Sequence, residues 1–169
     1  FGLDYTADNM LTAMMVHPPA FGMTIKSIDD SMAKNMPGIK AIDIVDSMPD
    51  SFERSWADEN SAFPKIAVIV GNSTWEVLNA KKALRIEWER ISKGESTSYH
   101  IEGLTQLLST KADQPSRVDG DPEKAFKNAA RVVERTYSAP FLAHNTLEPM
   151  NFFANVTADK AELVGPIQT

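Results

Sequence analysis

The hydrophobic pattern changes twice in the middle of the chain, and this most constrains the fold. Residues 66–71 are continuously apolar, which predicts a strand buried on both faces near the centre of a sheet. Ser73 and Glu76 have the spacing of a capping box, with each side chain bonding the other residue's amide, and predict a helix to about Ala83. Residues 84–88 alternate as in a strand with one wet face. The order predicts a compact α+β unit with a crossover connection.

The stretch before residue 66 supplies the partners for that strand. Apolar or alternating runs at 11–17, 24–28 and 39–45 predict two or three strands. Asp29 and Asp30 are N-cap candidates for a short helix that Pro37 and Gly38 would end. Residues 46–65 are polar, with scattered aromatics, and we expect a loop there.

The next element is an amphipathic helix over residues 98–110. Its four large aliphatic side chains share one helical stripe, so we expect this face to lie on something apolar. The four are Ile101, Leu104, Leu107 and Leu108. A polar stretch follows, and we place a linker at 111–122 between a first domain, 1–110, and the start of a second, 123–169.

The second domain is expected to be rich in strands. Asp121 caps and Pro122 starts a helix that ends at Ala129 or Ala130. Strands are predicted after it at 131–137, 151–157 and 161–164, the last two joined by a tight link.

Composition excludes several classes of partner. The chain has 17 basic and 23 acidic residues and a net charge of −6, which disfavours nucleic acid and anionic membrane surfaces. It has no cysteine, so any iron–sulfur centre must lie elsewhere. The longest apolar run falls far short of the roughly 20 residues of a membrane-spanning helix. We therefore expect no nucleic acid and no membrane insertion.

Signatures of common catalytic sites are missing, and one dense cluster at residues 139–151 remains. His144 and Glu148 are four apart and could ligate a metal from one helical face, but Pro140 and Pro149 argue against a long helix. The favoured interpretation is structural: both side chains hydrogen-bond loop amides and hold a turn.

The remaining histidines and two of the tryptophans are also interpreted structurally. His17 and His100 are each isolated in sequence, and we expect them at the surface or in loops. Trp75 and Trp88 fall on apolar phases of the predicted helix and strand, which favours core positions over a cofactor platform.

Taken together, several segments resemble the large subunits of molybdenum hydroxylases, the xanthine dehydrogenase and aldehyde oxidase family. The branch of isoquinoline 1-oxidoreductase β subunits is the most similar. The resemblance covers nearly the whole chain and rests on the order of its motifs. These are Tyr5-Thr-Ala-Asp8, residues 11–18, Lys26-Ser-Ile-Asp-Asp30, Met36-Pro-Gly-Ile39, residues 68–84, Glu87-Trp88, Val133-Glu-Arg-Thr-Tyr137 and His144-Asn-Thr-Leu-Glu-Pro-Met-Asn151.

The resemblance implies an α/β hammerhead domain followed by the first strands of a molybdopterin-binding domain. Gly165-Pro-Ile-Gln-Thr169 falls where the family carries a tryptophan-x-proline-threonine-glutamine sequence, which makes Gln168 the candidate residue near the molybdenum oxo group. Gly165 and Ile167 depart from the family pattern in that loop. No catalytic residue of the family is expected in this chain, and Glu148 and His144 remain weaker candidates for cofactor binding.

The resemblance also implies cofactors and partners for a longer protein. It implies molybdopterin with molybdenum, a cytosine dinucleotide form being one option, and iron–sulfur clusters on a small [2Fe-2S] subunit. The rest of the large subunit is a further partner. The substrate would be an N-heterocycle or an aldehyde, oxidised with water-derived oxygen, in bacterial cytoplasm or periplasm. The chain by itself is expected to be an inactive fragment that binds no cofactor.

Two other functions are open at this point. One is a free-standing hammerhead module that binds a partner or acts as a scaffold without catalysis. The other is a degenerate family member that folds with its subunits but holds no molybdenum, which the departures around Gln168 suggest. Both chain ends look cut, which favours a piece of a longer protein over a short natural one.

Overall fold

The computed structural model describes residues 2–46, 63–91, 96–114, 116–142 and 144–166. It divides into two compact units, one formed by Ala7–Gln106 and the other by Phe1–Thr6 with Leu107–Thr169. Most of the expected loop at 46–65 lies outside the described residues.

A three-stranded antiparallel sheet forms the centre of the Ala7–Gln106 unit. Its strands are β1 (Thr12–Val16), β4 (Lys65–Gly71) and β3 (Ile39–Asp46), in the order β1-β4-β3. The apolar run is therefore the middle strand, as predicted, and its Ala67 and Ile69 are fully buried. Successive side chains of a strand point to opposite faces, so the consecutive buried residues Ile66 and Ala67 indicate that both faces of β4 are covered there.

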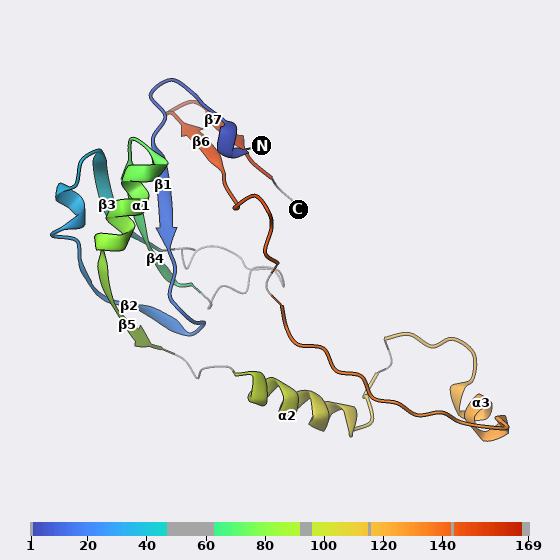
Figure 1. Ribbon diagram of the computed structural model, residues 1–169. Coiled ribbons are helices and arrows are strands. Elements are labelled where there is room, and N and C mark those ends of the chain that lie inside the picture. Colours follow the sequence, from blue (N-terminus) through green and yellow to red (C-terminus); the bar gives the residue numbers. More distant parts are fainter. Residues whose placement is uncertain (1, 47–62, 92–95, 115, 143, 167–169) are drawn as a thin grey trace. The chain divides into compact units, whose positions relative to one another are not determined.

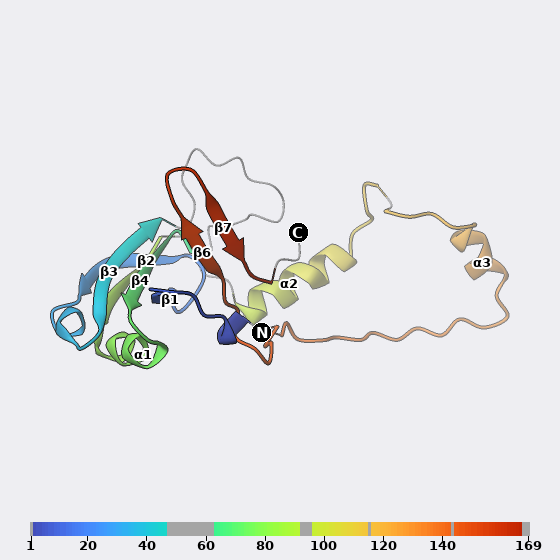
Figure 2. The same ribbon diagram turned by 90° about the horizontal axis from the view of Figure 1, so that it is seen from above.

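Helix α1 (Thr74–Ala83) follows β4 directly and lies against this sheet (Figures 1 and 2). The Ser73 hydroxyl oxygen accepts from the Glu76 amide at 3.4 Å and donates to the Glu76 carboxylate at 2.8 Å. The serine half of the predicted capping box is thus confirmed, and the glutamate bonds the serine hydroxyl. Val77 and Ala80 of α1 form the buried core with Ile69 and with Ala33 from another segment.

The start of α1 is locked to the turn that precedes β3. Gly38 has a φ of 78°, a backbone conformation that side chains rarely adopt, and its carbonyl accepts from the Asn72 amide at 3.0 Å. A Cβ on Gly38 would collide with the Glu76 carboxylate, and a Cβ on Gly71 would lie 2.9 Å from Val77 Cγ2. Glycine is therefore required at both positions, because a side chain at either one would collide with a side chain of α1.

The strand after α1 belongs to a second sheet. Strand β5 (Arg85–Arg90) pairs antiparallel with β2 (Met23–Asp29) in a two-stranded sheet. The predicted strand is confirmed, but α1 links two sheets and does not cross over within one. The register shifts between Ile25 and Ser27, which places Lys26 at a bulge. Lys26 Nζ lies 2.5 Å from Glu87 Oε1.

Three smaller predictions for this unit need correction. The helix expected after Asp30 is a single 3₁₀ turn, η2 (Ala33–Asn35), and Met32 stands at its N-cap without a side-chain bond. Because this turn has only three residues, neither Asp29 nor Asp30 is its N-cap. The Asp29 carboxylate accepts a hydrogen bond from the Ser31 amide instead. Trp75 is 69% exposed, because its position in the first turn of α1 faces away from the sheet, whereas Trp88 is half-buried.

Helix α2 (Thr97–Leu108) confirms the predicted amphipathic helix but not its burial. No residue of α2 is buried. The four aliphatic side chains of its stripe, Ile101, Leu104, Leu107 and Leu108, are 59%, 51%, 68% and 84% exposed. His100 was expected at the surface or in a loop, and it lies half-buried within this helix.

The other unit contains η1 (Gly2–Asp4), α3 (Pro122–Asn128) and a hairpin of β6 (Phe153–Val156) and β7 (Ala161–Val164). Asp121 caps α3 by accepting from the Lys124 amide at 2.9 Å, as predicted. The hairpin also matches its prediction, and its link is closed by the Thr157 amide donating to the Lys160 carbonyl at 2.8 Å.

The strand predicted at 131–137 is wrong. These residues are extended and exposed, and they have no strand assignment in the structure. An alternating pattern becomes a strand only when a neighbouring strand accepts and donates its backbone hydrogen bonds, and none does so here among the described residues. The observed fold is α+β, and the division at 111–122 stays a prediction.

Candidate functional site

The candidate cluster at 139–151 is irregular, and Glu148 is the residue in it with the most defined contacts. Its carboxylate Oε1 accepts from the Leu3 amide at 3.1 Å and from Asn151 Nδ2 at 3.2 Å. The Glu148 carbonyl accepts from the Thr146 hydroxyl at 2.7 Å. Asn151 also donates to the Pro149 carbonyl at 2.9 Å, so this short segment folds around its own polar groups.

Glu148 connects two ends of the sequence. The Leu3 amide lowers the pKa of Glu148 below its ordinary value; Asn151 lowers it less, and partial desolvation opposes both. A Cβ on Gly2 would overlap the Asn151 side chain, so Gly2 allows this close approach. The rings of Tyr5 and Phe153 lie 4.6 Å apart and extend the same contact. The carboxylate therefore acts here as an anchor for η1.

Of the three candidates for cofactor binding, the structure describes only the two weaker ones, His144 and Glu148. His144 is exposed and lies outside any helix, so it does not share a helical face with Glu148. Gln168 lies outside the described residues. Among the residues that the structure describes, no group of three or more histidine, aspartate or glutamate side chains could hold a metal ion. The cluster supplies structure, and we derive no catalytic step from it.

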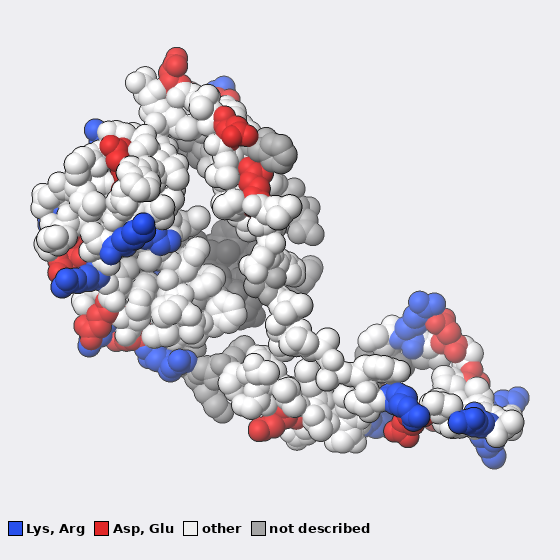
Figure 3. All heavy atoms as spheres, in the orientation of Figure 1, with Lys and Arg blue, Asp and Glu red and all other residues white. Residues whose placement is uncertain are grey.

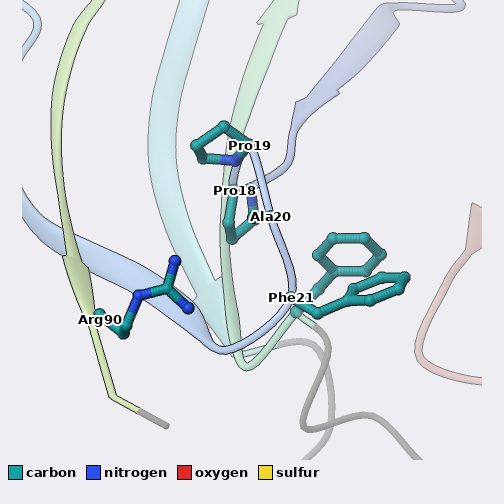
Figure 4. A pocket seen from close by; sticks show the side chains of 6 residues that line it. Pro18, Pro19, Ala20, Phe21 and Arg90 are labelled. Carbon is teal, nitrogen blue, oxygen red and sulfur yellow. The ribbon is translucent and has the colours of Figure 1, made fainter. Parts of the chain in front are cut away.

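A cavity of about 300 Å³ beside the loop between β1 and β2 was missed by the sequence reasoning. Figure 4 shows Phe21 and Arg90 on opposite sides of it, with Pro18 and Pro19 between them. It is lined by Pro18, Pro19, Ala20, Phe21, Phe63 and Arg90. His17 is exposed and follows the end of β1, as expected, and its ring lies 4.9 Å from that of Phe63.

The described lining of this cavity suits contact with an apolar group. Its lining side chains are apolar except for the Arg90 guanidinium, which is a permanent cation. None of them is a carboxylate, imidazole, thiol or hydroxyl that could move a proton or attack a substrate. In the sequence, Pro18 and Pro19 predicted only the end of a strand. The cavity itself could not be predicted, because Arg90, which also lines it, is far along the chain.

The best-defined ion pair joins β2 to β5 and is exposed. Glu87 accepts from Lys26 Nζ at 2.5 Å and from the Ser27 hydroxyl at 3.1 Å. The hydrogen bond to Glu87 raises the pKa of Lys26, and the same bond lowers the pKa of Glu87. Both groups therefore keep their charges over the ordinary pH range, which suits a structural pair and not proton transfer.

Within the described ranges, the helices are all too short or too polar to pass through a bilayer.

Comparison with known proteins finds remote similarity to oxidoreductases. No protein-family model matches the chain. It is 25% identical over 157 residues to a membrane-bound aldehyde dehydrogenase (pyrroloquinoline-quinone) of Gluconacetobacter polyoxogenes, covering 91% of this chain and 19% of the relative. The crystal structure of quinoline 2-oxidoreductase from Pseudomonas putida 86 matches 60% of this chain and 15% of its own, at 19% identity and a TM-score of 0.41. The chain is thus a remote relative of an oxidoreductase and spans about a fifth of that relative's length.

Proposed function

We propose that this chain is a segment of the molybdopterin-binding large subunit of a molybdenum hydroxylase, where it supplies scaffold and subunit contacts. The observation that carries the proposal is an alignment covering 91% of this chain and only 19% of a dehydrogenase. It agrees with the ordered motifs from Tyr5 to Asn151 and with an α+β first unit. The hammerhead description and the isoquinoline-type branch belong to this proposal.

The described residues do not by themselves fit a molybdenum cofactor. Glu148 already accepts from Leu3 and Asn151, and His144 stands exposed in an irregular segment. The family resemblance gives Gln168 as the candidate that faces the cofactor, since a neutral amide can donate a hydrogen bond without adding charge. In the proposal the remaining cofactor contacts and the general base come from other parts of the large subunit.

The proposed parent reaction is oxidation of an aldehyde or hydroxylation of an N-heterocycle. The relative's name supports an aldehyde, but that name also specifies pyrroloquinoline quinone, a different cofactor from molybdopterin. The family resemblance implies that electrons would leave to iron–sulfur clusters on a small partner subunit; this chain itself has no cysteine to hold a cluster. The cofactor is therefore the first property to measure.

The test is cofactor analysis of the full natural reading frame, purified with its neighbouring small subunit. We expect near-stoichiometric molybdenum by metal mass spectrometry and a fluorescent oxidised pterin in the acid extract. Protein from cells grown with tungstate in place of molybdate is the matched control, and it should lose activity with aldehydes or heterocycles. A folded protein that lacks molybdenum, or that yields pyrroloquinoline quinone, would overturn the proposal.

A further inference from the structure

The first turn of the chain belongs to the unit that is formed by the other end of the sequence. Phe1–Thr6 groups with Leu107–Thr169, and the Ala7–Gln106 unit is inserted between these two pieces. The first residues of a domain are poorly ordered unless other residues tie them down. In this chain the ties come from residues that lie just before β6 or at its start.

A hydrogen bond and a ring contact hold this first segment. The Leu3 amide donates to the Glu148 carboxylate at 3.1 Å, and the Tyr5 and Phe153 rings lie 4.6 Å apart. The Tyr5 amide donates to the Gly2 carbonyl at 3.1 Å, which closes the turn itself. Figure 3 shows more acidic than basic side chains over η1, β6 and β7. A neutral amide and packed rings therefore hold the segment, more than ion pairs do.

Burial within this unit follows the same contacts. From residue 107 to residue 166, every described residue is exposed except for five that are half-buried. These five are Glu148, Asn151, Phe153, Glu162 and Gly165. The first three meet residues 2–5, and the other two lie in β7 and directly after it. The least exposed part of the unit is therefore the part that η1 contacts.

The position of Phe153 gives this contact its importance. A two-stranded hairpin is marginally stable by itself in water and needs further packing. Strands β6 and β7 have four residues each and pair with no third strand among the described residues. Phe153 begins β6 and pairs with Val164, the last residue of β7, at the end opposite the tight link. Packing on Phe153 therefore supports the open end of the hairpin.

We propose that residues 2–6 are an N-terminal strap that stabilises the pairing of β6 with β7, so that release of the strap opens the hairpin. The strap and the hairpin are separated in sequence by the whole inserted unit. Opening would be local, because Ile69 and Val77 are buried in a core within that other unit. The inference does not depend on the proposed function.

The experiment is amide hydrogen exchange of the 169-residue chain, followed residue by residue by NMR. Tyr5→Ala removes the ring that packs on Phe153, and the matched control Tyr137→Ala removes a ring that is 89% exposed. The paired amides of β6 and β7 should exchange about fivefold faster in Tyr5→Ala, as expected for the loss of one aromatic pair. They should be unchanged in Tyr137→Ala, and the amides of β4 and α1 should be unchanged in both variants.

A second pair of variants tests the hydrogen bond. Glu148→Ala removes the acceptor of the Leu3 amide and should also speed exchange in the hairpin. Glu134→Ala removes an exposed carboxylate of the same unit and should not. Coupling between two sites is reciprocal, so Phe153→Ala should in turn speed exchange of the Leu3 amide.

Faster exchange that is confined to the hairpin, in either Tyr5→Ala or Glu148→Ala, supports the N-terminal strap. Unchanged exchange of β6 and β7 in both variants would overturn it, and so would equal acceleration in the two control variants. An equal acceleration of β4 and α1 would also overturn it, because the hairpin would then not open separately from the packed core. None of these rates involves molybdenum, so the result and the proposed function fail independently.

Discussion

The stretch from β1 to β5 and the stretch from α2 to β7 have similar lengths but opposite packing. In the first, a middle strand and a capped helix enclose Ile69, Val77 and Ala80. In the second, no described residue is buried, although large apolar side chains are frequent. The comparison teaches that apolar composition alone does not make a core, because burial needs two elements that present matching faces to each other.

The largest expected effect comes from removing side-chain volume in the packed stretch. Ile69 is fully buried, so Ile69→Ala should lower the free energy of unfolding by about 2–5 kcal/mol. Leu108→Ala in the 169-residue chain should lower it by less than about 0.5 kcal/mol, because Leu108 is already exposed. Urea unfolding followed by circular dichroism measures both. Equal losses would show that the two stretches share one cooperative core.

Two glycines with positive φ sharpen the comparison. Gly38→Ala should destabilise by more than the roughly 1–2 kcal/mol of a left-handed backbone, because the new Cβ also meets the Glu76 carboxylate. Gly120 has a φ of 69° and nothing within 4 Å of its Cβ position. Gly120→Ala brings the same backbone strain but no collision, and because the residues around Gly120 are all exposed we expect the strain to stay local and to leave the melting temperature of the packed stretch unchanged. If calorimetry shows a larger fall in melting temperature for Gly120→Ala than for Gly38→Ala, the stretch that contains Gly120 is the more stable one.

Helix caps give a smaller and more local contrast. Ser73→Ala removes the cap of the packed helix α1 and should cost about 0.5–2 kcal/mol, with recovery in Ser73→Thr, which keeps the hydroxyl. Asp121→Ala removes the cap of α3 and should reduce helical ellipticity without moving the urea midpoint, since α3 buries no residue. A shift of the midpoint in Asp121→Ala would mean that α3 unfolds together with the core.

The smallest effect is a pH dependence at Glu148. Its pKa is lowered in the folded chain, so the bond to the Leu3 amide is fully present above the ordinary value of 4.5 and is lost as the pH falls through the lower folded pKa. The chemical shift and exchange rate of the Leu3 amide should report this change. Glu148→Gln should abolish the dependence, and Glu134→Gln, which also removes one charge, should retain it. If the Leu3 amide signal changes with pH as much in Glu148→Gln as in the natural chain, a group other than Glu148 causes the pH dependence.

The sequence predicted the local part of the candidate site. The proline-flanked segment identified Glu148 as a structural acceptor of loop amides, and the Leu3 bond agrees with that interpretation. The identity of the donor could not be predicted, because Leu3 and Glu148 are 145 positions apart. The cavity beside Phe21 and Arg90 was missed for the same reason. The role of Gln168, which lies outside the described residues, stays a prediction.

The sequence by itself determined the elements whose signals are local. The caps at Ser73 and Asp121, the apolar run of β4 and the tight link between β6 and β7 all depend on groups within a few positions of each other. Only the tertiary structure decided that β5 pairs with β2, that Trp75 is exposed and that residues 131–137 form no strand. Those outcomes depend on which elements pack together. A periodic pattern shows that one face of an element is apolar, but it does not show which other element covers that face.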